Sequence, residues 1–581
     1  MKRVLIASFI ILFPLIPIAP GLFDQSQGFY VDWWTNIWNI EYHARYFSVH
    51  HSMPDVIHTW NPERGIGRPD PLFYGFLFYP IMALIAQLLG TNLSLRLGII
   101  VLWILQFVAL KKVFLRLTDN YYLVYCVTAL FLWGIYPLTN LYNRSALTEF
   151  FATGLLLCAL CYFFLFLWSN LKREKINNAV FFGIFLTLCI GTHPITALYG
   201  GTFLFIVMVF SIGRLAKEIS NNLPLILIII VLCILTVLPW LYVTFKYMAD
   251  LSISSSPSVS VYSQTIDWPL SRFLHFPMDK RSLIHGWDVP GLTPWLEAQM
   301  NMPLLILLAW KLFRMKRRIW SLKLHEKIYI VYPIILFLLT TLMSFSPWIW
   351  QFIPTIYKNI QMSYRMVTYQ NLSLVLGLVS VFSLQKRLVP TRLFVVSKKT
   401  LVVTTICLSI SFVAALEKLL HSSAIMGDIN FPSSDRSKEF LATGWTAGIK
   451  GYVLSSVPKI DEEFSQELVF LPDPFKSGVK TVEEKRIFTD KPIWVKTNIQ
   501  AFPWNKISDN SIEIPFTHFK QSGGMIVFHL DAGNHMINYN YSVNSFYVRL
   551  RMVSFTIITI WLATSFLLSI QSFLKNMSNK F

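Results

Sequence analysis

Long apolar stretches recur along the chain and are separated by short polar segments. A run of about 20 apolar residues is long enough to cross a hydrocarbon core of about 30 Å as a helix. The stretches of this kind are 3–22, 95–115, 121–139, 149–169, 177–193, 197–213, 223–244, 301–314, 327–345, 366–384, 400–417 and 550–573. They predict an α-helical polytopic membrane protein with about 12 transmembrane helices.

The first apolar stretch begins after Lys2 and Arg3, as the apolar part of a signal peptide would. No small-residue cleavage site of the usual kind follows it. We therefore expect residues 3–22 to remain in the protein as an uncleaved membrane anchor.

One further apolar stretch, 71–90, does not fit this series. If it crossed the membrane, every basic loop after it would move to the other side. We interpret it as a juxtamembrane or re-entrant segment on the outer side, with breaks at Pro71 and Pro80. The alternative is a full span combined with an error in one of the other spans.

Basic residues lie in small clusters between the apolar stretches rather than in one patch, so nucleic acid is not an expected partner. The chain has 50 Lys and Arg against 31 Asp and Glu, a formal net charge of +19. The clusters are Lys111/Lys112/Arg116, Lys172/Arg173/Lys175, Arg214/Lys217, Lys311 to Lys327, Lys386 to Lys399 and Lys575/Lys580. Because cytoplasmic loops are enriched in Lys and Arg, we place every cluster and both termini in the cytoplasm. The protein is then expected in the inner (cytoplasmic) membrane, with 23–94, 139–148, 245–300, 346–365 and 418–549 facing outward.

The last outward segment is the only one large enough to fold by itself. Apolar and polar residues alternate within it in segments 466–472, 491–499, 510–519, 524–530 and 535–543, as they do in half-buried strands. The expected organisation is therefore a transmembrane domain over 1–417 with a first outer loop 23–94, an extracytoplasmic β-sandwich-like domain over 418–549, and a terminal helix and cytoplasmic tail over 550–581.

Composition agrees with a lipid environment. Hydrophobic residues make up 54% of the chain and charged residues 14%, and the mean hydropathy is +0.51. All six cysteines fall inside predicted spans. A disulfide framework or a cysteine-based zinc site is therefore excluded from the outward segments.

The first outward loop carries an acid, Asp32, directly outside the first predicted span. Trp33 follows it, and Glu41 and His43 come shortly after. An acid among aromatic residues at the interface lies where a lipid headgroup and a water-soluble group meet. The plainer interpretation is that Asp32 only solvates a loop.

Arg144, Ser145 and Glu149 lie where the chain re-enters the membrane. Ser145 is expected to cap the helix, and Glu149 lies in its first turn, where the helix dipole favours an acid. The functional alternative is an active-site pair, because an ionisable group near hydrocarbon is costly unless it is paired or used.

Two later residues return to the same predicted surface. His193 lies between an outward helix and the next inward one, so it marks a hairpin turn or contacts an anionic headgroup. Arg365 starts another inward helix, where a cation opposes the helix dipole. That position favours a phosphate contact. The chain contains no Walker loop, dinucleotide-binding glycine motif, G-x-S-x-G or H-E-x-x-H.

Several of these segments resemble a known family. The resembling segments are 32–41 (DWWTNIWNIE), 65–74 (GIGRPDPLFY), 142–150 (YNRSALTEF), Thr192-His193, 363–365 (SYR) and 523–535 (GGMIVFHLDAGNH). They are similar to bacterial membrane proteins labelled "6-pyruvoyl-tetrahydropterin synthase-related", which look like GT-C glycosyltransferases of the YfhO and dolichyl-phosphate-mannose-protein mannosyltransferase kinship. The resemblance is best over roughly the first 200 residues. The family pattern usually shows a histidine four residues after the acid, where this chain has Asn36.

The resemblance implies a GT-C-like fold and a glycosyltransferase that moves a hexose or pentose from a polyprenyl-phosphate carrier to a glycan, lipid or protein acceptor of the cell envelope. By position, Asp32 would be the catalytic base or the ligand of a divalent metal such as Mg²⁺ or Mn²⁺, although no cofactor is certain. Glu149 is a second catalytic candidate. The substrate-binding candidates are Arg144, His193, Arg365, Trp33, Glu41 and His43. The alternatives are a transporter or flippase of lipid-linked glycans, a ligase that moves a whole glycan, and a non-catalytic scaffold.

Overall fold

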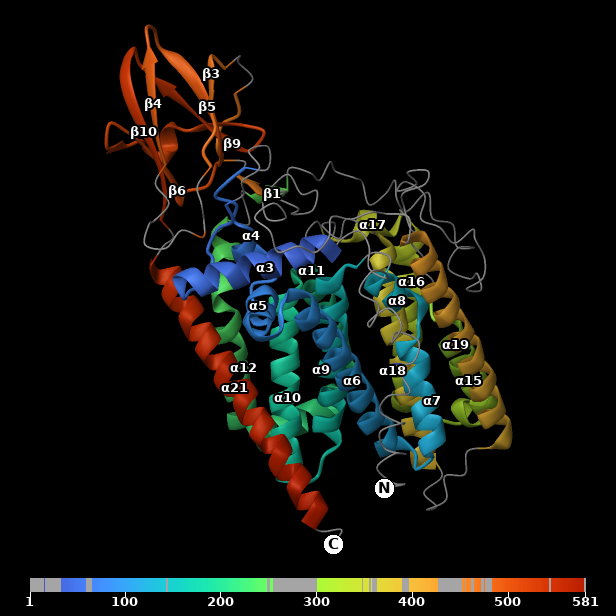
Figure 1. Ribbon diagram of the computed structural model, residues 1–581. Helices are drawn as coiled ribbons and strands as arrows, with labels where there is room; N and C mark the ends of the chain where they lie inside the picture. Colours follow the sequence, from blue (N-terminus) through green and yellow to red (C-terminus); the bar gives the residue numbers. More distant parts are fainter. Residues whose placement is uncertain are drawn as a thin grey trace.

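A computed structural model describes most of the chain. The described residues are 15, 33–58, 65–142, 145–247, 251–253, 300–346, 348–354, 357, 363–388, 397–426, 452–454, 456–460, 464–471, 475, 483–542 and 545–578. They form a helical bundle and, at one end of it, a domain of β-strands (Figure 1). Asp32, Arg144 and all of the predicted span 3–22 except Leu15 lie outside the described residues.

Eight helices of the described residues are long and apolar enough to cross a membrane. They are α6 (Thr91–Leu117), α9 (Leu147–Trp168), α10 (Lys172–Thr192), α12 (Ile212–Tyr247), α16 (Leu324–Phe345), α18 (Val367–Leu388), α19 (Lys398–Met426) and α21 (Ser545–Ser578). The chain is therefore a multi-pass membrane protein. The buried faces of these helices share one large hydrophobic core.

The remaining predicted spans take other forms. The stretch 121–139 is not one straight helix but two, α7 (Tyr121–Leu132) and α8 (Ile135–Leu141), bent by 51° at the break. α11 (Pro194–Phe210) has 17 residues, and α15 (Met302–Trp320) carries basic residues through its second half. With the bent pair counted as one span, the described residues provide up to nine crossings. The count of about 12 therefore remains a prediction.

The segment 71–90 does not form a spanning helix. It contains the short α4 (Asp70–Phe73) and α5 (Phe78–Leu89), whose 12 residues extend about 18 Å at 1.5 Å per residue. That length is too short for a hydrocarbon core of about 30 Å. α5 packs on α3 (Trp33–His50), which lies across the end of the bundle nearest the β domain (Figure 1).

The helix ends that carry the basic clusters lie together at the opposite end of the bundle. Arg116 at the end of α6 forms an ion pair with Glu174 at the start of α10, and Lys175 forms one with Glu218 on α12. The Lys386 ammonium group on α18 donates to the Arg116 carbonyl at 2.5 Å. We call this end the basic end and the other the β-domain end (Figure 1).

Two four-stranded sheets form the β domain. Their strands are β3 (Gln466–Leu468), β4 (Glu483–Thr489), β5 (Ile493–Gln500), β6 (Asn505–Asp509), β7 (Ile512–Glu513), β8 (Lys520–Ser522), β9 (Met525–Leu530) and β10 (Gly533–Tyr541). The orders are β4-β10-β6-β7 and β3-β5-β9-β8, antiparallel throughout except for the parallel pair β3–β5. A separate antiparallel pair joins β1 (Leu251–Ile253) to β2 (Tyr452–Leu454). Short helices α17 (Ile349–Phe352), η5 (Ser363–Met366) and η6 (Phe516–His518) complete the described elements.

The boundaries of the β region differ from those expected. α19 continues to Met426, so the predicted boundary at 418 falls inside a helix, and α21 begins at Ser545 rather than near 550. The five predicted strand segments all contain strand residues, and β4, β6 and β8 fall largely outside them. The C-terminal β domain itself is present as predicted.

The first outer loop is built into the β domain. Ile66 pairs with Ile499 in a parallel bridge, and its amide donates to the Asn498 carbonyl at 2.8 Å. Gly67 has φ +70°, and its carbonyl accepts from the Asn505 amide at 3.0 Å. A Cβ atom at Gly67 would overlap that amide, so only glycine fits this close approach.

A partly buried ion pair connects the same loop to the last helix. The Arg551 guanidinium on α21 lies 2.5 Å from the Asp55 carboxylate and donates to the carbonyls of Met53 and Pro54 at 3.0 and 3.2 Å. The hydroxyl groups of Tyr46 and Tyr541 meet at 2.9 Å nearby. The β domain is thus fixed to the β-domain end of the bundle through contacts from α3, the first loop and α21.

Candidate functional site

The centre of the candidate site is a buried ion pair at the β-domain end of the bundle. Glu149 lies in the first turn of α9, and Arg365 lies in η5, directly before α18. The Arg365 Nε atom is 3.3 Å from Glu149 Oε2, and the two side chains are only 10% and 5% exposed. Removing a carboxylate from water is costly, and a guanidinium beside it offsets that cost.

Two further donors hold the Glu149 carboxylate. The Tyr136 hydroxyl donates to Oε1 at 3.0 Å, and the Asn140 amide donates to the same oxygen at 3.1 Å. Both donors come from α8, whose direction is set by the bend after α7. We call Tyr136, Asn140, Glu149 and Arg365 the Glu149 cluster. A cavity of about 30 Å³, lined in part by Tyr136, Asn140 and Thr153, borders it.

His193 lies close to this cluster and forms the hairpin turn that its sequence position predicts. It ends α10 and caps α11, and its Nδ1 atom accepts from the Thr196 amide at 3.2 Å. The Tyr369 hydroxyl on α18 donates to the Thr196 carbonyl at 3.3 Å, which connects His193 to the helix that follows Arg365.

Two tyrosines of the first outer loop, Tyr74 and Tyr79, connect this loop to the site. The Tyr74 ring meets His193 edge-on at 5.6 Å, and its hydroxyl bonds the hydroxyl of Thr148, the residue before Glu149. The Tyr79 hydroxyl donates to Asn36 Oδ1 at 3.3 Å. The first outer segment therefore reaches the Glu149 cluster through Tyr74.

Asn36 connects α3 to the turn that leads into α9. Its amide nitrogen donates to the Ser145 carbonyl at 3.2 Å while its oxygen accepts from Tyr79. A primary amide donates and accepts at once, which explains asparagine at this position by packing alone. Asp32 directly precedes the first residue of α3 in sequence.

The predicted capping role of Ser145 is wrong. α9 begins at Leu147 with Ala146 in the cap position and no side-chain cap. The Ser145 hydroxyl donates backward instead, to the carbonyls of Leu141 and Tyr142 at 3.2 and 3.0 Å. Ser145 also has φ +46°, a left-handed conformation in which it stabilises the turn rather than the helix start.

Three candidates on α3 are engaged away from the Glu149 cluster. The Trp33 ring lies under the Arg96 guanidinium at 5.8 Å. Glu41 accepts from the Thr91 hydroxyl at 2.5 Å and pairs with Arg45 at 3.3 Å, which holds α3 against the start of α6. His43 stacks on Tyr79 at 5.8 Å, and burial lowers its pKa to about 4, so it is neutral near pH 7.

The described residues around Glu149 do not fit a divalent cation. Within the described part of the chain, no three His, Cys, Asp or Glu side chains gather as metal ligands would. The Glu149 carboxylate has a guanidinium 3.3 Å away and two neutral donors on one oxygen. Metal ions in proteins bind carboxylate oxygens that face the ion, not oxygens already used by cations.

Sequence reasoning missed most of the neutral members of the site. Tyr136 was hidden because 121–139 reads as one apolar span, and Asn140 follows directly after it in a short outward segment. Tyr74 and Tyr369 lie in predominantly apolar sequence. The sequence signal that could have identified them is a polar side chain close to the end of a predicted apolar stretch.

Fold and site together define a multi-pass membrane protein with a C-terminal β domain and a buried acid–arginine pair at the end that bears it. Comparison with known family models, with curated proteins and with solved structures finds no match. The GT-C resemblance therefore remains a prediction that the sequence motifs carry.

Proposed function

We propose that this chain is a membrane glycosyltransferase that moves a sugar from a polyprenyl-phosphate carrier to an extracytoplasmic acceptor. The observation that carries the proposal is the buried Glu149–Arg365 pair at the β-domain end of the spanning helices. In the proposed orientation this pair lies near the outer membrane surface, where an ionisable group is costly unless it is paired or used.

The proposed orientation places the basic end in the cytoplasm. Lys and Arg clusters meet there on four helix ends, which supports this orientation under the positive-inside rule. The Glu149 cluster and the β domain then face the outside of the cytoplasmic membrane. Both termini are proposed to be cytoplasmic.

The reaction we propose is a single inverting displacement. The acceptor hydroxyl attacks the anomeric carbon, a new C–O bond forms, and the bond from that carbon to the phosphate oxygen breaks with its electron pair on polyprenyl phosphate. Asp32 accepts the hydroxyl proton. A positioned general base contributes about 10²–10⁴-fold to such a step.

Arg365 is the residue we assign to the phosphate of the leaving group. A guanidinium in a site with little water stabilises growing negative charge strongly. Glu149 is proposed to position Arg365 rather than to act as a base, because Tyr136, Asn140 and Arg365 already occupy its carboxylate. His193 is proposed to contribute a hydrogen bond, and Arg144 is proposed as a second cation from the segment before α9.

The β domain is proposed to hold the acceptor. Trp494 on β5 is half-buried beneath the Lys520 ammonium group at 4.1 Å and meets His529 edge-on at 5.2 Å. Indole rings of this kind stack on apolar faces of sugars. Trp504, in contrast, is buried against Phe502 at 4.8 Å and belongs to the core of the domain.

Reconstituted full-length protein tests the function. Proteoliposomes receive short-chain polyprenyl phosphate carrying one radiolabelled hexose or pentose, together with cell-envelope glycan, and the released polyprenyl phosphate is measured. We expect release with the unaltered protein and a loss of at least about 100-fold in Asp32→Asn. Asp119→Asn, an exposed acid at the basic end, is the matched control and retains full activity.

Two outcomes of this assay would count against the proposal. Equal release by Asp32→Asn and the control would remove Asp32 from the mechanism. Movement of intact lipid-linked sugar between leaflets without any release of polyprenyl phosphate would instead identify a transporter or flippase.

A further inference from the structure

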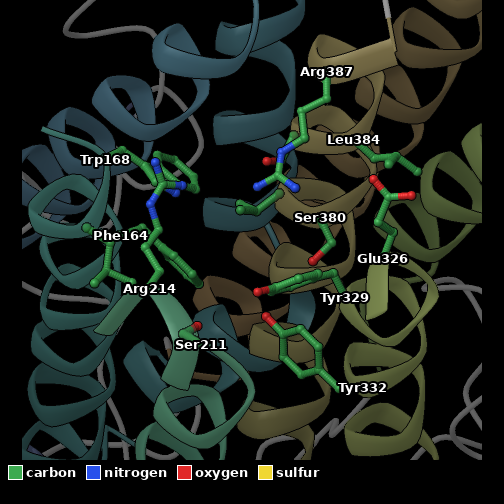
Figure 2. A pocket seen from close by; sticks show the side chains of 13 residues that line it. Phe164, Trp168, Ser211, Arg214, Glu326, Tyr329, Tyr332, Ser380, Leu384 and Arg387 are labelled. Atoms are coloured by element: carbon green, nitrogen blue, oxygen red, sulfur yellow. The ribbon is translucent and has the colours of Figure 1, made fainter. Parts of the chain in front are cut away.

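A cavity at the basic end of the bundle, remote from the Glu149 cluster, is lined by polar side chains (Figure 2). It has a volume of about 70 Å³ and lies between the end of α9, the α11–α12 junction, the start of α16 and the end of α18. It shares no lining residue with the cavity beside Glu149. Any function of this cavity is therefore separate from the proposed transfer reaction.

Two arginines enter the cavity from opposite sides. Arg214 lies in the first turn of α12 and Arg387 in the last turn of α18, and both side chains point toward the space between them (Figure 2). Both residues are exposed at the rim. Among the described residues, no carboxylate forms an ion pair with either guanidinium.

Hydroxyl groups lie between and below the two arginines. The hydroxyls of Tyr329, Tyr332 and Ser380 gather toward the middle of the cavity (Figure 2). Tyr332 and Ser380 are buried, whereas Tyr329 is exposed at the rim. A buried floor of hydroxyl donors below a cationic rim is complementary to an anionic oxygen group.

The charge balance of the lining favours a singly charged anion. Its one acid is Glu326, whose carboxylate also accepts from the Lys323 amide at 3.3 Å as part of the cap of α16. Two guanidinium groups and one carboxylate leave a net charge of +1, which matches a phosphodiester.

The surroundings match the depth of lipid headgroups. Trp168 at the end of α9 and Tyr329 on α16 border the cavity, and both are amphipathic aromatic residues of the kind found at membrane interfaces. The neighbouring helix ends carry the basic clusters, which attract anionic lipid surfaces. Basic pockets between transmembrane helices bind lipid phosphates in this way.

We propose that this cavity is a binding site for a phosphodiester group, with Arg214 and Arg387 binding its oxygens from two sides. The Tyr329 hydroxyl donates from below, together with one hydroxyl of the hydrogen-bonded pair Tyr332 and Ser380. The group has two sources of the same chemistry, the headgroup of an anionic phospholipid in the leaflet at the basic end and a soluble phosphodiester. The proposal does not depend on the glycosyltransferase reaction.

The test measures lipid binding by the full-length protein. Protein purified in detergent is titrated with phosphatidylglycerol, and bound lipid is counted by native mass spectrometry. The double variant Arg214→Gln/Arg387→Gln is expected to bind at least about tenfold more weakly. The matched control is Lys217→Gln/Lys386→Gln, which removes the same charge from the same two helices outside the cavity lining and is expected to change binding less than about threefold.

Two further arms distinguish the sources and guard against a folding defect. Displacement of phosphatidylglycerol by glycerophosphoglycerol at millimolar concentration would assign the site to a soluble phosphodiester, and resistance to it would assign the site to a lipid. Arg214→Lys/Arg387→Lys keeps the charge but loses the planar donor pair, so we expect intermediate binding with an unchanged unfolding temperature. Equal weakening by the cavity variant and the Lys217/Lys386 control would overturn the proposal.

Discussion

The two ends of the bundle hold arginines under opposite conditions. At the β-domain end, Arg365 is buried beside Glu149, whose carboxylate also accepts from Tyr136 and Asn140. At the basic end, Arg214 and Arg387 are exposed around a cavity and form no ion pair with a carboxylate of the described residues. At the β-domain end, the charge of Arg365 is balanced by Glu149. At the basic end, the cavity has excess positive charge.

This difference shows what an acid contributes in a chain with far more basic than acidic residues. With 31 acids for 50 Lys and Arg, at least 19 cations have no acid of their own to pair with, so the position of each buried acid is informative. A buried acid marks where a cation is held in a fixed position, as Glu149 holds Arg365. Cations gathered around a cavity without an acid partner mark where a ligand supplies the negative charge.

The largest expected effect comes from removing the buried cation. Arg365→Leu leaves the Glu149 carboxylate buried without its guanidinium and is expected to lower the free energy of unfolding by about 3–5 kcal/mol. Thermal unfolding in detergent measures it. The matched control is Arg45→Leu, which breaks an Arg–Glu pair of the same 3.3 Å separation at a more exposed position and is expected to cost about 1 kcal/mol or less. Equal losses would mean that the burial of the Glu149 pair has no energetic consequence.

A smaller effect is expected where the first loop meets the β domain. Gly67→Ala forces a side chain into a left-handed conformation and against the Asn505 amide, at a cost of about 2–3 kcal/mol. Limited proteolysis should then cut the loop faster. Gly523→Ala has a similar φ of +60° but open space around the new atom, so it isolates the backbone cost. A loss in Gly67→Ala no larger than in Gly523→Ala would show that the close approach to Asn505 does not matter.

The smallest expected effect is a dependence of the free energy of unfolding on pH, which buried histidines in and near the first loop cause. Burial lowers the pKa of His43 to about 4 and that of His58 to about 3, and His58 Nδ1 also accepts from the Gly67 amide at 3.3 Å. Both rings stay neutral in the folded protein, whereas the unfolded chain binds protons below about pH 6.5. Stability contributed by these groups is therefore present above that pH and is lost as the pH falls toward 4.

The expected loss between pH 7.5 and 5.5 is on the order of 1 kcal/mol for each histidine. Unfolding temperatures at the two pH values measure it. His58→Gln should reduce the pH dependence. The opposite dependence on pH is expected for His535. Burial lowers the pKa of its ring, but Asp509 at 2.6 Å and Asp531 raise that pKa by more. The stability that His535 contributes is therefore lost as the pH rises. A pH dependence that His58→Gln leaves intact would exclude His58 as its source.

Much of the helical architecture could be predicted because it depends on local sequence. α6, α9 and α10 are long apolar runs bounded by basic residues, and the exclusion of 71–90 followed from the charge pattern alone. β5 and β9 overlap the predicted strand segments 491–499 and 524–530. β4 could not be predicted because this exposed strand begins with four charged residues, Glu483 to Arg486, a pattern typical of a loop.

The site could be predicted only residue by residue. Glu149, His193 and Arg365 were all selected from their positions at helix ends, yet their partners come from distant parts of the chain. The contact between Glu149 and Arg365 joins α9 to η5, which lie far apart in sequence, and the Tyr136 contact depends on a 51° bend. Neither contact can be inferred from the local pattern of polar and apolar residues. The same limit applies to Ile66, whose pairing with Ile499 joins segments far apart in sequence.

The central claim is that Arg365, held by Glu149, stabilises the phosphate that leaves during sugar transfer. The most direct measurement is the rate of polyprenyl phosphate release by Arg365→Lys in proteoliposomes, compared with the unaltered protein under saturating donor. Lysine keeps the positive charge beside Glu149 but not the planar donor pair, so we predict at least about a tenfold lower rate with little change in unfolding temperature. An unchanged rate in a folded Arg365→Lys protein would contradict the account.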